Sequence, residues 1–195
     1  MKSDLIGHQT IIKIDDKEIL TLDDILPESK NLKILFIAKT PAPVSVEAGH
    51  YFQGKQGTMF WNKLAKYKIL TVPAGDFEDD HLLENLYGIT DIVKVPRSYG
   101  NEPSNEEYKE GLIRILEMIK YYNPKVIFFV YKKVLDQILK LSFNMQIKSK
   151  YGFNHDFEKI FGTKVFVFPM PGTPCTTVQA NYSMSELKKY LKISD

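Results

Sequence analysis

The stretch ILFIAKTPAPVSVEAGHYFQGKQGTMFW, residues Ile34–Trp61, reads as a strand, a long loop and the beginning of a helix. Its first residues form the short apolar run that is typical of a buried strand. The loop is rich in Pro and Gly and carries two aromatic residues before a Phe-Trp pair opens the helix. Loops at the carboxyl ends of parallel strands are where α/β proteins bind ligands. We therefore expect the ligand site of an α/β protein here.

The rest of the chain alternates apolar strands with helical patterns. The predicted core strands are residues 33–38, 89–95, 125–131 and 163–168. The predicted helices are residues 58–67, 76–86, 104–122 and 133–141, with a C-terminal helix that begins at a capping box over 183–186. Two β-rich runs around an Asp-Asp-Lys turn predict a hairpin over residues 9–22. This order predicts a three-layer αβα sandwich with a central four-stranded parallel sheet. We expect one domain over residues 1–195, with residues 1–30 as an N-terminal hairpin extension.

Composition excludes several classes of protein. Of the 195 residues, 44% are hydrophobic and 26% are charged, which is typical of a globular protein. The apolar run at 126–131 is too short to cross a bilayer, and no signal segment opens the sequence, so we expect a cytoplasmic protein. Cys175 is the only cysteine, which excludes an internal disulfide and a four-cysteine iron–sulfur cluster. The spacing of the four histidines does not indicate a metal site, and we expect no cofactor.

Charge is distributed unevenly along the chain. Residues 1–30 hold 4 Lys and 7 Asp or Glu, whereas residues 31–195 hold 22 Lys or Arg and 17 Asp or Glu. The body therefore carries about +5, which suits contact with phosphates. Arg97 and Arg114 are the only arginines. Because Arg is the commonest reader of base edges, such a chain could hold a nucleic-acid backbone without reading much sequence.

The loop after the first core strand resembles the first active-site motif of the uracil-DNA glycosylase superfamily, in particular its mismatch-specific uracil/thymine branch. That family reads Gly-Ile-Asn-Pro-Gly and then Gly-His-His-Tyr-Pro-Gly-Pro-Gly-Asn-His-Phe-Trp. This chain reads Ala-Lys-Thr-Pro-Ala over residues 38–42 and Gly-His-Tyr-Phe-Gln-Gly-Lys-Gln-Gly-Thr-Met-Phe-Trp over residues 49–61. The family's water-holding Asn is replaced by Thr40, and its Asn before Phe-Trp is replaced by Thr58.

The resemblance implies that a base flipped out of DNA is bound at this loop and that its N-glycosidic bond is cleaved there. The stacking aromatic corresponds to Phe52, with Tyr51 beside it, and Thr58 lies within the same base-binding motif. Thr40 would hold the water, although a hydroxyl lacks the amide's two functional groups. Lys39 is either a cation near the departing base, an amine nucleophile, or a solvated lysine at a strand end. His50 and Glu47 are alternative water activators, or hydrogen-bonded loop residues.

Two further segments extend the resemblance over residues 31–192. The sequence Gly-Ile-Thr-Asp-Ile-Val-Lys at 88–94 is similar to a strand that forms a pocket wall in the family, where Asp91 would accept a hydrogen bond from the base or cap the strand. The loop Met-Pro-Gly-Thr-Pro-Cys at 170–175 corresponds to the loop that enters the minor groove. Pro174 would be its wedge, beside Pro171, and the backbone N–H groups of Gly172 and Thr173 would bind a phosphate.

Three functions are open at this point. The first is a DNA repair enzyme, a monomer that hydrolyses the N-glycosidic bond of uracil or a related deaminated base in DNA. The second is a nucleic-acid-binding member of the same fold that has lost hydrolysis with the Asn. The third is a nucleotide-binding or phosphotransfer protein, because Gly-Lys-Gln-Gly-Thr at 54–58 superficially resembles a phosphate loop. It lacks the spacing of GxxxxGK[ST], which argues against that third function.

Overall fold

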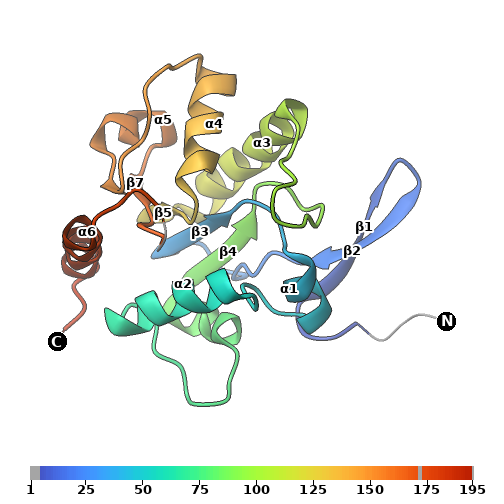
Figure 1. Cartoon of the computed structure of the whole chain (residues 1–195), viewed down its shortest axis with the longest axis horizontal. Helices are drawn as coiled ribbons and strands as arrows, with labels where there is room; N and C mark the ends of the chain where they lie inside the picture. Colours follow the sequence, from blue (N-terminus) through green and yellow to red (C-terminus); the bar gives the residue numbers. More distant parts are fainter. Residues whose placement is uncertain (1–4, 171–172, 195) are drawn as a thin grey trace.

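The computed structural model describes residues 5–170 and 173–194 of the chain. Within these residues a five-stranded sheet has the order β4-β3-β5-β7-β6 (Figure 1). Its strands are β3 Ile34–Ala38, β4 Tyr87–Asp91, β5 Val126–Phe129, β6 Gly152–Phe153 and β7 Lys164–Val167. The four parallel strands are the predicted ones, and the α/β class is confirmed. The short strand β6, which was not predicted, pairs antiparallel with β7 and forms one edge.

Helices cover both faces of this sheet. The α-helices are α1 Pro43–Ala48, α2 Lys55–Lys66, α3 Asn105–Tyr122, α4 Lys132–Phe143, α5 Glu158–Phe161 and α6 Thr177–Tyr190. Short 3₁₀ helices are η1 Glu78–His81, η2 Leu83–Asn85 and η3 His155–Phe157. In Figure 1, α1 and α2 lie below the sheet, and α3 and α4 lie above it. The predicted three layers are thus present.

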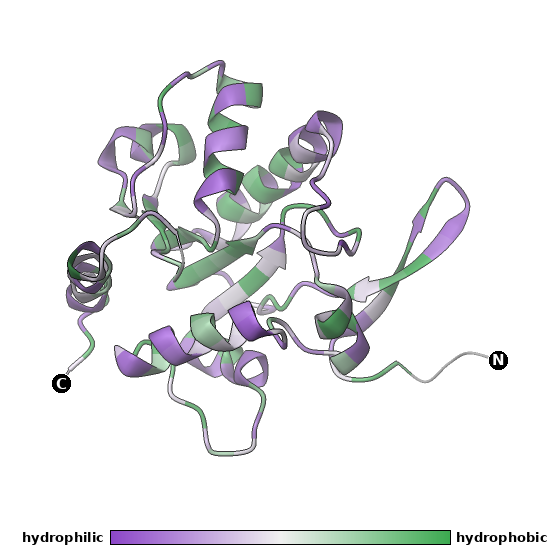
Figure 2. Cartoon of the chain, viewed as in Figure 1, coloured by the Kyte–Doolittle hydropathy of each residue, from purple (hydrophilic) through white to green (hydrophobic). Residues whose placement is uncertain are grey.

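The apolar strands supply two cores at once. Along β3, Ile34 and Phe36 belong to the core under α2, whereas Leu35 and Ile37 belong to the core under α3 and α4. Successive side chains of a strand point to opposite faces, so a strand buried on both faces needs a continuous apolar run. Figure 2 shows this pattern, with hydrophobic strands inside and hydrophilic residues on the outer sides of the helices.

The predicted hairpin is also confirmed. β1 Gln9–Ile14 pairs antiparallel with β2 Lys17–Leu22, and the two-residue turn is formed by Asp15 and Asp16. Both residues have positive φ, 47° and 61°, which is the backbone of a type I′ turn that Asp tolerates. The chain then returns to the sheet through a bridge between Ile25 and Ile89.

Two helix predictions were wrong. Residues 76–86 do not form one α-helix but the two 3₁₀ helices η1 and η2. The carboxylate of Asp79 points into the protein, where it accepts a hydrogen bond from the backbone N–H of Tyr51. The C-terminal helix begins seven residues earlier than predicted. Its true capping box is formed by Thr176 and Gln179, and residues 183–186 lie in the helix interior. The box at Ser104 and Glu107 that opens α3 is as predicted.

Among the described residues, no helix combines the length and the apolar character needed to span a membrane.

Candidate active site

A cleft of about 500 Å³ opens at the carboxyl edge of the sheet. Every parallel strand contributes a following residue to its lining, which consists of Lys39, Thr40, Ala42, Gln56, Arg97, Ser98, Tyr99, Tyr131, Lys133, Met170 and Thr173. The chain leaves β3 toward β4 on one side and leaves β5 toward β7 on the other. The ends of β3 and β5 therefore form the switch point where ligands bind in open α/β sheets.

An ion-paired group of three residues lies beside this cleft. Oε1 of Glu102 is 2.9 Å from Nζ of Lys39 and 3.2 Å from Nζ of Lys133. Partial burial on its own would raise the pKa of Glu102, but the hydrogen bonds and charges of the two lysines outweigh it and lower the pKa. At neutral pH, therefore, a carboxylate lies beside the cleft and is paired with two lysines of its lining, Lys39 and Lys133.

Thr40 lies in the cleft wall on a backbone that is held from two directions. The backbone N–H of Val93 donates to the carbonyl of Lys39 at 3.1 Å, and that of Arg97 donates to Pro41 at 3.0 Å. Arg97 also pairs with Glu107 on α3. These bonds fix the loop after β3 against the loop after β4, so the Thr40 hydroxyl is presented from a rigid wall.

Tyr131 is the half-buried aromatic residue that follows β5 in the cleft. Burial, together with the negative charge of Asp91, raises the pKa of Tyr131 to about 12. The phenol is therefore a neutral donor and acceptor over the whole physiological pH range. Tyr99, on the opposite wall, is 96% exposed at the rim.

Phe52 does not line this cleft. Its ring packs on Phe60 and Trp61, with centroid distances of 4.8 and 5.7 Å. Phe52 has φ of 59°, and a Cβ on Gly57 would overlap its carbonyl, so α2 begins tight against this residue. The structure thus holds the Phe52 ring rigid at the end of the loop, and base stacking on it stays a prediction.

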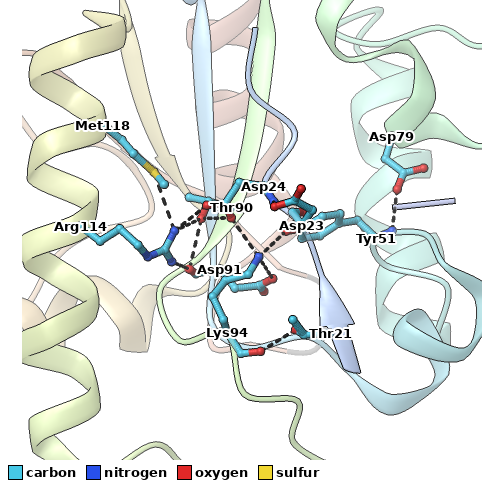
Figure 3. A network of polar contacts seen from close by, with 10 residues as sticks. All are labelled: Thr21, Asp23, Asp24, Tyr51, Asp79, Thr90, Asp91, Lys94, Arg114 and Met118. Atoms are coloured by element: carbon cyan, nitrogen blue, oxygen red, sulfur yellow. Dashed lines mark hydrogen bonds and ion pairs between the residues drawn. The ribbon is translucent and has the colours of Figure 1, made fainter. Parts of the chain in front are cut away.

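Tyr51 and Asp91 lie in a buried polar network between the N-terminal segment and β4 (Figure 3). The Tyr51 hydroxyl donates to the carbonyl of Asp23 at 2.9 Å and accepts from Lys94 at 3.1 Å. Oδ2 of Asp91 is 3.7 Å from Nζ of Lys94 and has no hydrogen-bond partner. Burial raises the pKa of Asp91 to about 6, against the attraction of Lys94. Neither side chain lines the cleft.

Asp24 connects the same network to α3. Its carboxylate accepts from Thr90 at 2.6 Å, Lys94 at 2.9 Å and Arg114 at 2.6 Å. Arg114, one of the two arginines, also donates to the carbonyl of Asp91. The guanidinium of Arg114 therefore donates its hydrogen bonds within the protein rather than to a nucleic acid.

The structure places the remaining residues of the first motif away from the cleft. His50 is buried, its Nδ1 lies 2.9 Å from Oδ1 of Asp79, and its ring stacks on Phe77 at 3.6 Å. Thr58 is exposed on α2, and its hydroxyl is 3.4 Å from the carbonyl of Gly54. Glu47 is exposed on α1. The fold brings Lys39 and Thr40 into one cleft but leaves these three residues outside it.

The second predicted loop reaches the cleft through Met170 and Thr173. The expectation of a free backbone N–H at Thr173 was wrong, because this group donates to the carbonyl of Met170 at 3.3 Å. The Thr173 hydroxyl donates to the same carbonyl at 2.6 Å. Pro174 is exposed, as a wedge requires, and Pro171 and Gly172 lie outside the described residues.

A sequence model described as the uracil DNA glycosylase superfamily matches residues 27–187. This chain belongs to that superfamily. A G/U mismatch-specific uracil DNA glycosylase of Schizosaccharomyces pombe is 28% identical over 142 residues, which are 71% of this chain and 43% of the relative. The chain thus covers less than half of the relative's length. All residues that line the cleft fall within the part matched by the superfamily.

Sequence reasoning missed Glu102, Tyr131 and Lys133. Glu102 lies in a polar loop, and the two others follow an apolar strand, so none belongs to a recognisable motif. The position of Tyr131 at the end of a predicted parallel strand, and of Lys133 just after it, was the available signal.

Proposed function

We propose that this protein is a DNA glycosylase that hydrolyses the N-glycosidic bond of uracil, or of a related deaminated base, flipped out of DNA into the cleft. The observation that carries the proposal is that Thr40 lines one cleft with Lys39 and Tyr131, at the switch point of a superfamily member. The similarity to a protein named as a G/U mismatch-specific uracil DNA glycosylase supports the choice of uracil. A flipped base is the means by which such enzymes reach the bond.

The reaction needs a water, a leaving base and stabilisation of charge on the sugar. In our proposal, the water oxygen forms a bond to C1′ while the bond from C1′ to the base breaks, and the bonding electron pair leaves with the base. Thr40 would accept a hydrogen bond from this water. The carboxylate of Glu102 would stabilise the positive charge that develops on the sugar and would take the water's proton.

The two lysines would act on the leaving base. Lys39 is ion-paired with Glu102 at 2.9 Å, which suits a cation that stabilises the anionic base more than an amine nucleophile. Lys133 shares the same carboxylate oxygen and would reinforce this effect. Tyr131, with its neutral phenol, would offer the base both an aromatic face and a hydrogen-bonding group. DNA phosphates would be bound by basic residues of the body, which carries about +5, and the exposed Pro174 would enter the space that the base leaves.

The decisive experiment incubates the purified protein with labelled oligonucleotides that carry one uracil opposite G, opposite A, or in a single strand. Hot alkali then cleaves abasic sites. We expect cleavage by the wild type, and about a 100-fold lower rate for Thr40→Ala and for Glu102→Gln, the lower end of what a positioned acid–base group contributes. Lys125→Met is the matched control, because Lys125 is exposed before β5, at the opposite edge of the sheet.

The replacement of the family's Asn by Thr40 favours a second candidate, a binding protein without hydrolysis. A hydroxyl offers fewer hydrogen-bonding groups than an amide, so water positioning would be weaker. Retained binding to uracil-containing strands without cleavage at enzyme excess would support this candidate. Cleavage that is unchanged in both Thr40→Ala and Glu102→Gln would refute the chemistry proposed for the cleft.

A further inference from the structure

Four side chains with metal-binding donors meet beside the hairpin, outside the cleft. They are His8, His50, Asp79 and Asp80, and one donor atom from each lies within 4.8 Å of all the others. They come from three segments: the residues before β1, the loop after α1, and η1. The separations along the chain are large, which explains why the histidine spacing did not indicate a metal site.

The distances within the cluster are close to those between the ligands of a tetrahedral ion. Nδ1 of His50 is 2.9 Å from Oδ1 of Asp79 and 3.7 Å from Oδ1 of Asp80. Nε2 of His8 is 2.8 Å from Oδ1 of Asp80. Zinc lies about 2.0–2.2 Å from nitrogen and oxygen ligands, so its ligands are about 3.4 Å apart at the tetrahedral angle. The three distances lie on both sides of that value.

The backbone around the cluster is built for this close approach. Gly7 and Gly49 both have positive φ, and a Cβ on Gly7 would lie 2.5 Å from the carbonyl oxygen of Gly49. That carbonyl accepts from the backbone N–H of His8 at 2.7 Å. Only glycine, which has no Cβ, allows two chain segments to approach so closely in this conformation. His8 and His50, each next to one of these glycines, therefore lie with their rings 5.4 Å apart at 87°.

Contacts outside the cluster orient two of the four side chains. The backbone N–H of Tyr51 donates to Oδ2 of Asp79 at 2.6 Å, which leaves Oδ1 directed at His50. The ring of His50 is stacked on Phe77 at an interplanar angle of 10°. Such outer contacts fix the orientation of ligands in metal sites. Asp79 is fully buried, whereas Asp80 is half-exposed and leaves a path for an ion to enter.

We propose that His8, His50, Asp79 and Asp80 form a structural binding site for a divalent transition-metal ion, with zinc the best fit to the donors. Two neutral imidazoles and two carboxylates balance the charge of a divalent ion, and a set of four protein ligands is typical of structural rather than catalytic zinc. The ion would cross-link the N-terminal segment to the loop that carries Tyr51 and Phe52. It would thereby stabilise the first motif without taking part in hydrolysis.

The test uses the full chain, freed of metal with a chelator and titrated with Zn²⁺ by calorimetry. We expect one Zn²⁺ per chain and a higher unfolding temperature in its presence. Asp80→Asn and His8→Ala should each weaken Zn²⁺ binding by more than about 100-fold. That loss is larger than the one expected from removing a residue that only orients a ligand. Both residues are partly exposed, so these variants should fold, which circular dichroism without metal verifies. Co²⁺ in place of Zn²⁺ should give the absorption spectrum of a tetrahedral site.

His81→Ala is the matched control. His81 also has two carboxylate neighbours, Asp76 at 2.9 Å and Glu84 at 2.7 Å, but they bind opposite nitrogens of its ring and cannot share one ion with it. We expect this variant to bind Zn²⁺ as the wild type does. No Zn²⁺ binding by the wild type, or binding that is unchanged in Asp80→Asn and His8→Ala, would overturn the proposal and leave the cluster as an ion-paired network. These readouts are independent of glycosylase activity.

Discussion

The buried carboxylate of Asp91 should make stability depend on pH in a way that one substitution removes. Asp91 is 1% exposed, and Lys94 is its nearest cation, at 3.7 Å. Burial raises the pKa of Asp91 from 3.8 to about 6. In the unfolded chain the carboxyl returns to its ordinary pKa. Folding therefore favours the protonated form of Asp91, and the charged form costs free energy.

The size and the pH window of this cost follow from the two pKa values. One pKa unit corresponds to about 1.4 kcal/mol, so a shift of about two units costs about 3 kcal/mol above pH 6. Below pH 3.8 the carboxyl is protonated in both states, and the cost vanishes. Between these limits the folded state binds more protons than the unfolded state, so the contribution of Asp91 to stability falls as pH rises.

The assay compares urea unfolding of the wild type and Asp91→Asn at several pH values between 4 and 7.5. Trp61, the single tryptophan, is buried at 3% exposure and reports unfolding by its fluorescence. We expect the variant to gain about 2.4 kcal/mol relative to the wild type between pH 4 and pH 7. A constant offset from new contacts of the amide does not affect this change with pH. Asp16→Asn, at the exposed hairpin turn, is the control and should show no such trend.

A difference between Asp91→Asn and the wild type that stays constant from pH 4 to pH 7.5 would refute the reasoning. It would mean that the carboxylate is as well stabilised in the fold as in water. A difference that changes in the opposite direction would mean that Lys94 outweighs burial and lowers the pKa of Asp91.

Four other substitutions test the core, the polar network and the cleft. Gly111→Ala should destabilise the protein by about 2 kcal/mol, although Ala favours helices, because its Cβ would overlap the carbonyl of Ile92; urea unfolding measures this. Asp24→Ala should cost about 3 kcal/mol in the same assay, because it removes the shared acceptor of the buried Thr90 and the partly buried Lys94 and Arg114. Tyr131→Leu should lower the rate of uracil release about 10- to 100-fold, the value of one stacked base, and Phe52→Leu should lower it less, because only Tyr131 lines the cleft.

Each of these predictions has a control or an opposite outcome. Glu110→Ala, an exposed change next to Gly111 on α3, should leave stability within about 0.5 kcal/mol. Glu18→Ala removes an exposed ion pair with Lys13 and should also have little effect, in contrast to Asp24→Ala. If Phe52→Leu abolishes uracil release while Tyr131→Leu does not, the stacking role returns to Phe52, as the family motif implies.

Local patterns in the sequence were sufficient for much of the fold. The continuous apolar runs gave the four parallel strands because a strand buried on both faces must be apolar throughout. The two aspartates at 15 and 16 gave the hairpin turn because Asp tolerates positive φ. The prediction of a helix over residues 76–86 was wrong because local patterns were not sufficient there. The tertiary contacts of Asp79 with His50 and Tyr51 override the local helical preference.

The sequence by itself determined the α/β class, the position of the two loops predicted to be functional and the family to which they point. Those properties depend on residues that are near one another in the chain. Only the tertiary structure decided that Glu102 joins Lys39 and Lys133 at the cleft, that Tyr51 and Asp91 lie in an internal network, and that His8 meets His50. Sequence order does not encode these encounters directly, because they arise only when strand order and sheet register bring distant segments to the same place.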